Sequence, residues 1–470
     1  MMKKTGRLRQ KVEELDMEQF DVLIIGGGPG GYLCAERAAQ NGLTAAVVEK
    51  RALGGTCLNE GCVPTKSLLY CAKQYAAAQH GADYGVHAEN VSFDHAAVID
   101  RKNKVVKTLV SGVGFTMKSH KVKVYTASAK VLGKNAAGLF EVDAGGVTIA
   151  GKRLVVATGS VASVPPIPGV KEGLASGFVM TNREILDLRE VPKTLVCIGG
   201  GVIGLEMACY FATIGVKVIV IEMMPKIAGP TDPEICDILM KTYKKLGMEF
   251  YLNAGVKKVE NGGVTYEDAS GLHTVACDRV LLSAGRRANI EGLDLEEKLG
   301  VATERGKVLT DEHLCTNVEG VYAVGDCNGK LMLAHTAYRE AEVAVNHMRG
   351  IKDHIDYSII PSVIYTTPEV ACVGETEQSA KDKGLDVKVV KAPMMASGRY
   401  VAENLKGDGF CKLIYDVKKR ELVGVHIVGS YASEMIYGAA AMVYSKLPVQ
   451  HLDKIVFPHP TVCEVIREAL

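Results

Sequence analysis

The chain has 470 residues, of which 47% are hydrophobic and 23% are charged. That length exceeds what one compact core accommodates and predicts roughly two to four domains. The 55 basic and 54 acidic residues leave a formal charge of +1. This balance argues against nucleic acid or a strongly anionic surface as the main partner.

The N-terminal segment, residues 1–19, is a polar tail with basic residues such as Lys3 and Arg7. It lacks the apolar core of a secretory signal, and Glu13 and Glu14 argue against a transit peptide. No uninterrupted apolar run reaches the ~18 residues of a membrane span. The 13 cysteines are odd in number and mostly scattered singly, which is typical of a reducing compartment. We therefore expect a cytoplasmic protein without membrane contacts.

Residues 21–49 predict a strand, a glycine turn, a helix and a second strand. The turn contains GxGxxG in the form of Gly26, Gly28 and Gly31, and Glu49 closes the second strand. In such a turn one glycine allows the tight bend, one allows a pyrophosphate to approach, and one allows helix and strand to pack closely. The helix N-terminus then offers N–H groups to phosphates, and the acid can accept ribose hydroxyls.

The same pattern recurs at residues 193–222, with Gly199, Gly201, Gly204 and the closing Glu222. In both units 18 residues separate the third glycine from the acid. One such motif is weak evidence, but two with flanking strands favour two dinucleotide sites over two glycine turns without ligands. A carboxylate at Glu222 repels a 2′-phosphate and so favours NAD over NADP, unless this acid merely faces solvent.

Further strands and a linker are predicted between and after these units. From about residue 351 the pattern alternates, which favours an antiparallel sheet followed by helices. The predicted segments are a strand and turn at 153–159, a proline-rich linker at 164–169, a similar strand and turn at 280–285, a strand at 320–326 that ends in an aspartate, antiparallel strands at 410–415 and 422–428, and helices near 431–446 and 461–469.

We therefore expect an α/β protein with two Rossmann-like dinucleotide-binding domains and a C-terminal α+β domain. The first dinucleotide-binding domain would occupy 20–160, be interrupted by the second at 161–285, and be completed at 286–350. The C-terminal domain would occupy 351–470.

Two cysteines, Cys57 and Cys62, follow the first fingerprint closely. In a regular helix residues five apart are separated by ~7.5 Å along the axis, whereas a disulfide needs Cα atoms within ~6.8 Å. A bond between them therefore requires a distorted segment, which Gly54, Gly55 and Gly61 permit, and Pro64 suits the first turn of a following helix. Two unrelated thiols or half of a metal site are the alternatives, but no second close cysteine pair completes a zinc site.

The run Gly54–Lys66 resembles the redox-active segment of the FAD-dependent pyridine nucleotide–disulfide oxidoreductases. The resemblance extends over about residues 20–470 and includes Ala157–Gly159, Val324–Asp326 and Phe457–Glu464. It implies FAD at the first fingerprint, NAD at the second and a C-terminal dimerisation domain. Within the family, the chain is most similar to members that oxidise protein-bound dihydrolipoamide.

The resemblance also implies roles for individual residues. Cys62 corresponds to the thiol against the flavin, and Cys57 to the thiol that exchanges with substrate. Lys66 corresponds to a lysine near the flavin that pairs with an acid at the position of Glu206. Composition alone would make these two a surface lysine and a helix acid. The resemblance further implies cofactor contacts for Asp326, Gly55, Thr56, Lys66, Thr158, Gly159 and Gly285.

The C-terminal tail offers a base for thiol chemistry. Only a thiolate attacks a disulfide, and histidine is the usual base near neutral pH. His459 lies between two prolines, and Glu464 can fix the tautomer of its ring, as in a catalytic triad. In the family that the chain resembles, this histidine acts across a homodimer interface. The resemblance also implies that the protein's partner is a lipoyl-bearing protein of a 2-oxoacid dehydrogenase or glycine cleavage complex.

Three residues depart from the pattern of the family. Glu60 lies between the cysteines, where its charge would raise a thiol pKa or alter docking, although we expect a solvent-facing loop residue. Phe457 and Cys463 flank the histidine segment. The alternative functions are another NAD(P)H-dependent disulfide reductase of the same family, or a non-catalytic scaffold subunit of a multienzyme complex.

Overall fold

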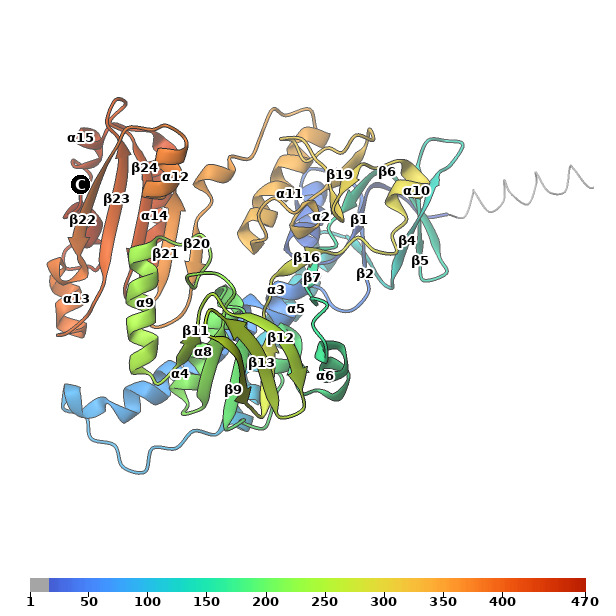
Figure 1. The fold of residues 1–470 in the computed structure, drawn as a ribbon. Helices are drawn as coiled ribbons and strands as arrows, with labels where there is room; N and C mark the ends of the chain where they lie inside the picture. The colour runs from blue at the N-terminus through green and yellow to red at the C-terminus, as the bar shows by residue number, and fades with distance from the viewer. Residues whose placement is uncertain (1–16) are drawn as a thin grey trace, which may run out of the picture. The chain divides into compact units, whose positions relative to one another are not determined.

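The structure, a computed structural model, describes residues 17–470, so most of the tail expected at 1–19 lies outside the described residues. The described chain forms two compact units. The first contains the chain up to Pro64, Asn103–Ala162 and Arg286–Ile355. The second contains Thr65–Lys102, Ser163–Gly285 and Asp356–Leu470. Each unit is built around its own sheets (Figure 1).

The first unit has a seven-stranded sheet in the order β3-β2-β1-β6-β5-β4, with β19 paired to β6. The pairs β3-β2, β2-β1, β1-β6 and β6-β19 are parallel, and β6-β5-β4 continue antiparallel. The strands of this sheet are β1 (Gln19–Ile25), β2 (Ala45–Glu49), β3 (Lys123–Thr126), β4 (Ala129–Lys134), β5 (Phe140–Ala144), β6 (Thr148–Val156) and β19 (Val321–Ala323).

Helices and short ribbons complete the first unit. The helix α2 begins directly after the glycine turn, with a proline at its first position, which suits the fixed φ of proline. These elements are α2 (Pro29–Gln40), α3 (Gly55–Glu60), the ribbon β7 (Ser160–Ala162) with β16 (Arg286–Ala288), α10 (Leu295–Leu299), the ribbon β17 (Thr303–Glu304) with β18 (Lys307–Val308), η2 (Asp326–Asn328) and α11 (Ala334–Met348). Two helices, α4 (Cys62–Gln79) and α5 (His95–Ser119), have residues in both units.

The second unit contains a five-stranded parallel sheet in the order β11-β10-β9-β15-β8, a three-stranded antiparallel sheet, and the helices around them. The elements are η1 (Gly81–Tyr84), α6 (Val170–Ser176), β8 (Val179–Met180), α7 (Asn182–Ile185), β9 (Thr194–Ile198), α8 (Val202–Thr213), β10 (Lys217–Ile221), α9 (Pro233–Lys245), β11 (Glu249–Tyr251), β12 (Gly255–Glu260), β13 (Gly263–Asp268), β14 (Gly271–Ala276) and β15 (Arg279–Leu282).

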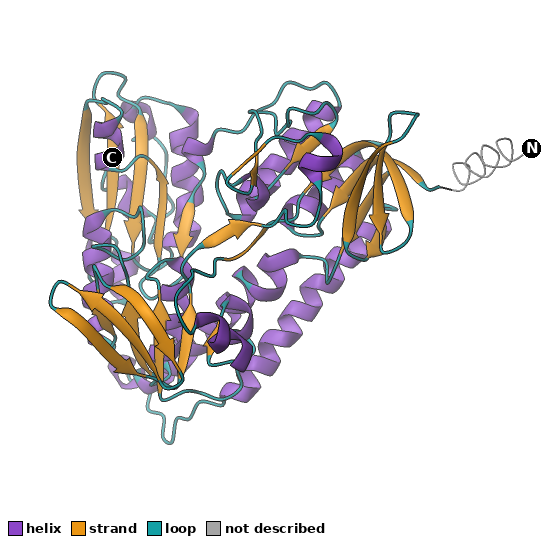
Figure 2. Cartoon of the chain, turned by 45° about the vertical axis from the view of Figure 1, so that its right-hand side comes forward, coloured by secondary structure: helices purple, strands orange, loops and turns teal. Residues whose placement is uncertain are grey.

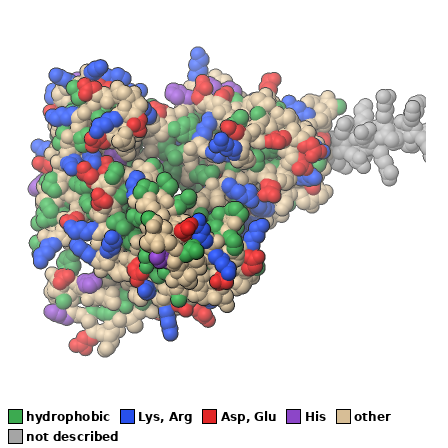
Figure 3. Space-filling model, viewed as in Figure 1, with side chains coloured by type: hydrophobic (Ala, Val, Ile, Leu, Met, Phe, Trp, Pro, Cys, Tyr) green, Lys and Arg blue, Asp and Glu red, His purple; other side chains and the backbone are tan. Residues whose placement is uncertain are grey.

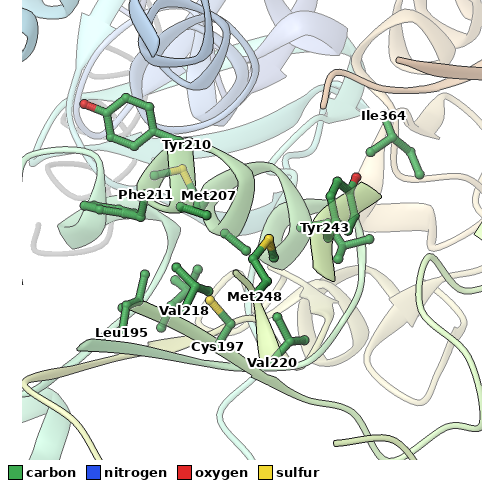
Figure 4. Close-up of a cluster of buried hydrophobic side chains, with 14 of the residues drawn as sticks. Leu195, Cys197, Met207, Tyr210, Phe211, Val218, Val220, Tyr243, Met248 and Ile364 are labelled. Carbon is green, nitrogen blue, oxygen red and sulfur yellow. The ribbon is translucent and has the colours of Figure 1, made fainter. Parts of the chain in front are cut away.

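The helix α8 follows the second glycine turn and is buried from Leu205 to Ala212. Its Tyr210 and Phe211 pack in one core cluster with Leu195 of β9 and Val218 of β10 (Figure 4). A helix that is apolar all round belongs inside a core. This core holds the start of α8, and with it the second glycine turn, in a fixed place.

The last part of the second unit is a five-stranded antiparallel sheet in the order β20-β21-β24-β23-β22 (Figure 2). The antiparallel pairing expected near 410–428 is thus confirmed, as is the helix expected near 431–446. The helix expected over 461–469 is shorter, because it spans only Glu464–Arg467. The elements are η3 (Tyr357–Ile359), β20 (Ser362–Ile364), β21 (Val370–Gly374), α12 (Glu377–Asp382), β22 (Val387–Pro393), η4 (Met394–Ala396), α13 (Gly398–Glu403), β23 (Phe410–Asp416), β24 (Leu422–Val428), α14 (Ala432–Ser445), α15 (Val449–Leu452) and α16 (Glu464–Arg467).

The surface carries both signs of charge. On the face shown in Figure 3, lysine and arginine side chains lie interspersed with acidic ones. Among residues 17–470, none of the helices is long and apolar enough to cross a membrane. The same residues contain no group of three or more His, Cys, Asp or Glu side chains suited to a metal ion.

Candidate active site

The first glycine turn connects β1 to α2 and leaves no room for side chains at two positions. A Cβ on Gly26, whose φ is +106°, would lie 2.3 Å from the carbonyl oxygen of Ala157. A Cβ on Gly31 would lie 1.8 Å from the carbonyl oxygen of Gly26. At Gly28, the residue before α2, a Cβ would meet only the Cα of Gly55 at 3.7 Å, and no side chain caps the helix. The first N–H groups of α2 can therefore receive a phosphate.

The second turn, between β9 and α8, repeats this construction. A Cβ on Gly199 would lie 2.5 Å from the carbonyl oxygen of Ser283, and one on Gly204 would lie 2.3 Å from that of Gly199. At Gly201, which precedes α8, a Cβ would meet nothing within 4 Å, and again no side chain caps the helix. Both turns thus present an open, positively polarised helix end.

The two closing acids make the same pair of hydrogen bonds. Glu49 accepts the N–H of Gly27 at 2.7 Å and that of Arg51 at 2.8 Å. Glu222 accepts the N–H of Gly200 at 2.7 Å and that of Met224 at 2.8 Å. Each carboxylate oxygen keeps a second lone pair for a ribose hydroxyl. Glu222 is therefore fastened to its own glycine turn and does not merely face solvent.

One buried hydroxyl in the first unit supports a bound nucleotide cofactor. Thr158 Oγ1 is one of four hydroxyls of the first unit that are buried without a hydrogen-bond partner among residues 17–470. It lies beside the first glycine turn, because a Cβ on Gly26 would be 3.1 Å from the Cα of Thr158. A buried hydroxyl without a partner costs about 1–3 kcal/mol of stability. A bound ligand or water that forms a hydrogen bond with the hydroxyl removes this cost. Asp326, at the end of the β19 turn, accepts a hydrogen bond from Ser160 Oγ, which in turn accepts one from Arg286 Nε at 2.7 Å. The donors and acceptors of this region fit a polar cofactor such as FAD.

The cysteine segment folds as two helices separated by a break. Cys57 lies in the six-residue helix α3, Gly61 interrupts the helical backbone, and α4 begins at Cys62. The distortion expected in this glycine-rich segment is therefore present, and it lies at Gly61. Pro64 lies in the first turn of α4 as expected. Cys57 is half-buried and Cys62 is exposed.

The cysteine segment packs directly on the first glycine turn. The N–H of Gly54 donates to the carbonyl oxygen of Gly27 at 2.8 Å. A Cβ on Gly55 would lie 2.6 Å from the Cα of Gly28, so only glycine permits this approach. Thr56 lies between Gly55 and Cys57 on the same short helix. The thiol segment and the nucleotide-binding turn therefore form one site within the first unit.

Glu60 is not the solvent-facing loop residue that the sequence suggested. It is the last residue of α3 and only 8% exposed. Its carboxylate accepts two hydrogen bonds from the Arg51 guanidinium, Nη2–Oε1 at 2.6 Å and Nη1–Oε2 at 3.1 Å. An anion is stable at this depth because a cation contacts both of its oxygens.

Lys66 and Glu206 form an ion pair in the second unit. Lys66 Nζ donates to both carboxylate oxygens of Glu206, at 3.0 and 2.8 Å. Glu206 is 4% exposed and also accepts the N–H of Tyr365 at 3.0 Å. The Lys66 ammonium lies 4.4 Å from the centre of the Tyr365 ring, within the range of a cation–π contact. A residue of α4 is thus joined to one of α8, 140 positions away.

His459 and Glu464 lie within hydrogen-bond distance in the tail. His459 Nδ1 is 2.9 Å from Glu464 Oε1, and the other oxygen of Glu464 accepts the N–H of Thr461 at 2.9 Å. The Thr461 N–H and the His459 ring together hold the pKa of the Glu464 carboxyl below its usual value. With an ionised acid at Nδ1, that nitrogen carries the hydrogen and Nε2 is left to accept a proton. The His459 side chain is 78% exposed, so Nε2 is accessible.

Sequence reasoning missed several neighbours of these residues. Tyr32, which directly follows Gly31, shares a short hydroxyl–hydroxyl hydrogen bond with Tyr338 of α11. The Ser160–Arg286 contact beside Asp326 was missed, as was the clamp from Asn59 to the backbone of the cysteine segment. Only the position of Tyr32 beside the fingerprint gave a signal, because the others depend on residues distant in sequence or on loop geometry.

The fold and the site define a redox protein with two dinucleotide-binding turns and a thiol segment on the first. The sequence profile for pyridine nucleotide-disulphide oxidoreductases matches residues 20–341, and that for their dimerisation domain matches residues 360–470. The chain therefore belongs to the pyridine nucleotide-disulphide oxidoreductase family.

Curated relatives cover nearly the whole chain. The dihydrolipoyl dehydrogenases of Cupriavidus necator and Bacillus subtilis are each 38% identical to it, over 96% of this chain and 97% of theirs. The mitochondrial dihydrolipoyl dehydrogenase of Pisum sativum is 37% identical, over 98% of this chain and 93% of its own. A solved structure of the HOCl-induced flavoprotein disulfide reductase RclA from Escherichia coli, in complex with Cu(II), has a TM-score of 0.85 at 27% identity, covering 96% of this chain and 99% of that one.

Proposed function

We propose that this protein is a dihydrolipoyl dehydrogenase, which oxidises a protein-bound dihydrolipoyl group to the lipoyl disulfide with NAD as electron acceptor. The packing of the cysteine segment on the first glycine turn carries the proposal, because it joins two thiols to a nucleotide site in one unit. The names of the relatives, at 37–38% identity, support the choice of substrate.

The two glycine turns divide the chain into parts that would bind different cofactors. Residues 20–160 and 286–350 would bind FAD, 161–285 would bind NAD, and 351–470 would form the interface of a homodimer. When bound, FAD and NAD supply the electron-pair and hydride transfer that protein side chains lack. The match of residues 360–470 to a dimerisation domain supports the assignment of the last part.

The side chains have distinct roles in the exchange of thiols. His459 Nε2 takes a proton from one thiol of the substrate, and the resulting thiolate attacks Cys57 Sγ of a Cys57–Cys62 disulfide. Cys62 leaves as a thiolate, and a mixed disulfide joins the substrate to Cys57. The second substrate thiol then attacks the substrate sulfur of this mixed disulfide and breaks its bond to Cys57 Sγ. Its proton passes to the departing Cys57 sulfur, and the substrate leaves as a disulfide. Glu464 stabilises the positive charge on His459.

Several remaining assignments belong to the same proposal. His459 would act on the cysteines of the partner subunit in the homodimer. Lys66, paired with Glu206, would place a positive charge near the reactive part of FAD, and Asp326 would bind its ribityl chain. The lipoyl-bearing partner would be a protein of a 2-oxoacid dehydrogenase or glycine cleavage complex. The free thiols outside the Cys57–Cys62 pair support a reducing compartment, the cytoplasm.

Formation of NADH from NAD and dihydrolipoamide tests the activity. The wild-type protein should form NADH, and Cys57→Ser should lose at least about 99% of this rate while keeping FAD. Cys71→Ser, which removes a thiol from α4 instead, should retain the rate. An active Cys57→Ser variant would refute the role of this thiol. NADPH-dependent reduction of another disulfide, without dihydrolipoamide oxidation, would favour the alternative reductase. A protein that binds no flavin would favour the scaffold.

A further inference from the structure

Glu60 places a carboxylate inside the thiol segment, at the point where its two helices meet. It is the last residue of α3, three positions after Cys57, and is followed by Gly61 and Cys62. Residues three apart on a helix have Cβ atoms about 5–6 Å apart, so Glu60 and Cys57 lie on the same side of α3. A carboxylate on the same side of a short helix disfavours a thiolate, the form of Cys57 that thiol exchange requires.

Arg51 links this carboxylate to the first nucleotide turn. Its backbone N–H donates to Glu49, the acid that also holds the N–H of Gly27. Its guanidinium donates a hydrogen bond to each carboxylate oxygen of Glu60, at 2.6 and 3.1 Å. A bidentate pair of this kind fixes direction as well as distance. The arginine therefore connects the end of β2 to the end of the thiol-bearing helix α3.

A second clamp on the segment is neutral. Asn59 Nδ2 donates to the carbonyl oxygens of Leu53 and Gly55, at 3.0 and 2.9 Å. Asn59 fixes the start of the segment to its end but adds no charge. The charged residue of α3 is therefore Glu60, and Arg51 pairs with it.

Other elements of the first unit bring two titratable groups toward Cys57. Tyr32 of α2 and Tyr338 of α11 interact electrostatically with Cys57, and burial raises the pKa of each hydroxyl. Both tyrosines therefore remain neutral near pH 7. Lys66 lies one turn after Cys62 on α4, and its charge is paired with Glu206.

We propose that Arg51 and Glu60 are positioning residues for the thiol exchange proposed above: the pair fastens α3 to the first nucleotide turn and cancels the negative charge beside Cys57. Because of this pair, α3 can bury the Glu60 carboxylate without raising the pKa of the Cys57 thiol. It also keeps α3 in place when the two sulfurs are not bonded to each other. Arg51 and Glu60 act through Cys57 and need not touch the substrate.

Alkylation of Cys57 as a function of pH tests the charge in this proposal. The FAD-loaded protein is reduced with dithiothreitol, freed of reductant, treated with iodoacetamide from pH 4 to 10 and analysed by peptide mass spectrometry. Arg51→Gln leaves Glu60 as a lone anion and should raise the apparent pKa of Cys57 by about one unit. Glu60→Gln leaves Arg51 as a lone cation and should lower it by a similar amount.

Three further variants sharpen the test. The double variant Arg51→Gln/Glu60→Gln removes both charges and should return the profile to within a few tenths of a unit of wild type. Arg51→Lys keeps the cation and should do the same. If Arg51→Gln does not fold, the downward shift in Glu60→Gln, absent from Arg51→Lys, preserves the test. Glu18→Gln, at an exposed ion pair with Lys123 on the edge strand β3, is the matched control.

Shifts of the same sign in the two single variants, or no shift in either, would overturn the proposal. The alkylation involves neither lipoyl substrate nor NAD. A wild-type protein that fails to oxidise dihydrolipoamide would therefore refute the proposed function while leaving the alkylation result to be judged separately.

Discussion

The Lys66–Glu206 pair predicts a large and graded loss of stability. At 2.8 Å and an effective dielectric constant of about 20, the attraction between the two charges is roughly 6 kcal/mol. The Lys66 side chain is 32% exposed, so solvent reduces the net effect to about 2 kcal/mol. Glu206→Ala also removes the acceptor of the Tyr365 N–H, which adds about 1 kcal/mol.

We therefore expect Glu206→Ala to lower the free energy of unfolding by about 3 kcal/mol. Glu206→Gln should cost about 1 kcal/mol less, because its amide oxygen can still accept the Tyr365 N–H. Urea unfolding followed by far-UV circular dichroism measures both, since the chain has no tryptophan. Glu377→Ala removes an exposed ion pair with Lys381 and should cost less than about 0.5 kcal/mol. Equal unfolding midpoints for Glu206→Ala and Glu377→Ala would refute this reasoning.

Three more predictions concern the nucleotide turns and the tail. Gly31→Ala should abolish FAD retention, measured as the flavin-to-protein absorbance ratio. Gly112→Ala should retain flavin, because a Cβ at this position of α5 meets nothing within 4 Å. Equal ratios for the two variants would contradict the steric argument. Glu464→Gln should slow NAD reduction by dihydrolipoamide about 10- to 100-fold by releasing the ring of His459. The pKa of this carboxyl is held below its usual 4.5, so Glu464 stays ionised as the pH falls from 8 to 5. Protonation of Glu464 should therefore cause no loss of rate in this range. Glu222→Gln should raise the kcat/KM ratio of NADP to NAD about tenfold by removing repulsion of a 2′-phosphate, and an unchanged ratio would argue against this site for the adenosine ribose.

The sequence predicted the nucleotide turns best because their chemistry is local. The glycines, the following helix and the closing acid lie within one short stretch, so spacing alone indicates their geometry. A distortion of the cysteine segment was expected on a similarly local argument, because two thiols five residues apart cannot bond across a regular helix. The sequence did not single out Gly61 among the three glycines of the segment. The class of fold followed from the repetition of this unit and from the alternating strands near Phe410–Asp416.

Contacts between distant segments could not be predicted from the residues themselves. Nothing in the composition pairs Lys66 with Glu206, and only the resemblance to a family did so. Glu60 was misjudged because a charged residue in a glycine-rich loop usually faces water, and its burial depends on a side chain nine residues earlier. The C-terminal helix was overestimated because Thr461–Cys463 use their backbone in a turn that lets Glu464 contact His459.

The hydrogen bonds of Glu49 and Glu222 to their own turns have a consequence for cofactor affinity. Both carboxylates are oriented by backbone N–H groups of the protein, so a ribose meets acceptors that are already ordered. Immobilising a flexible side chain on binding typically costs about 0.5–1.5 kcal/mol, and here folding has met that entropic cost beforehand. The two nucleotide sites are thus preorganised, and each gains up to roughly tenfold in affinity over one whose acid is disordered until its ligand arrives.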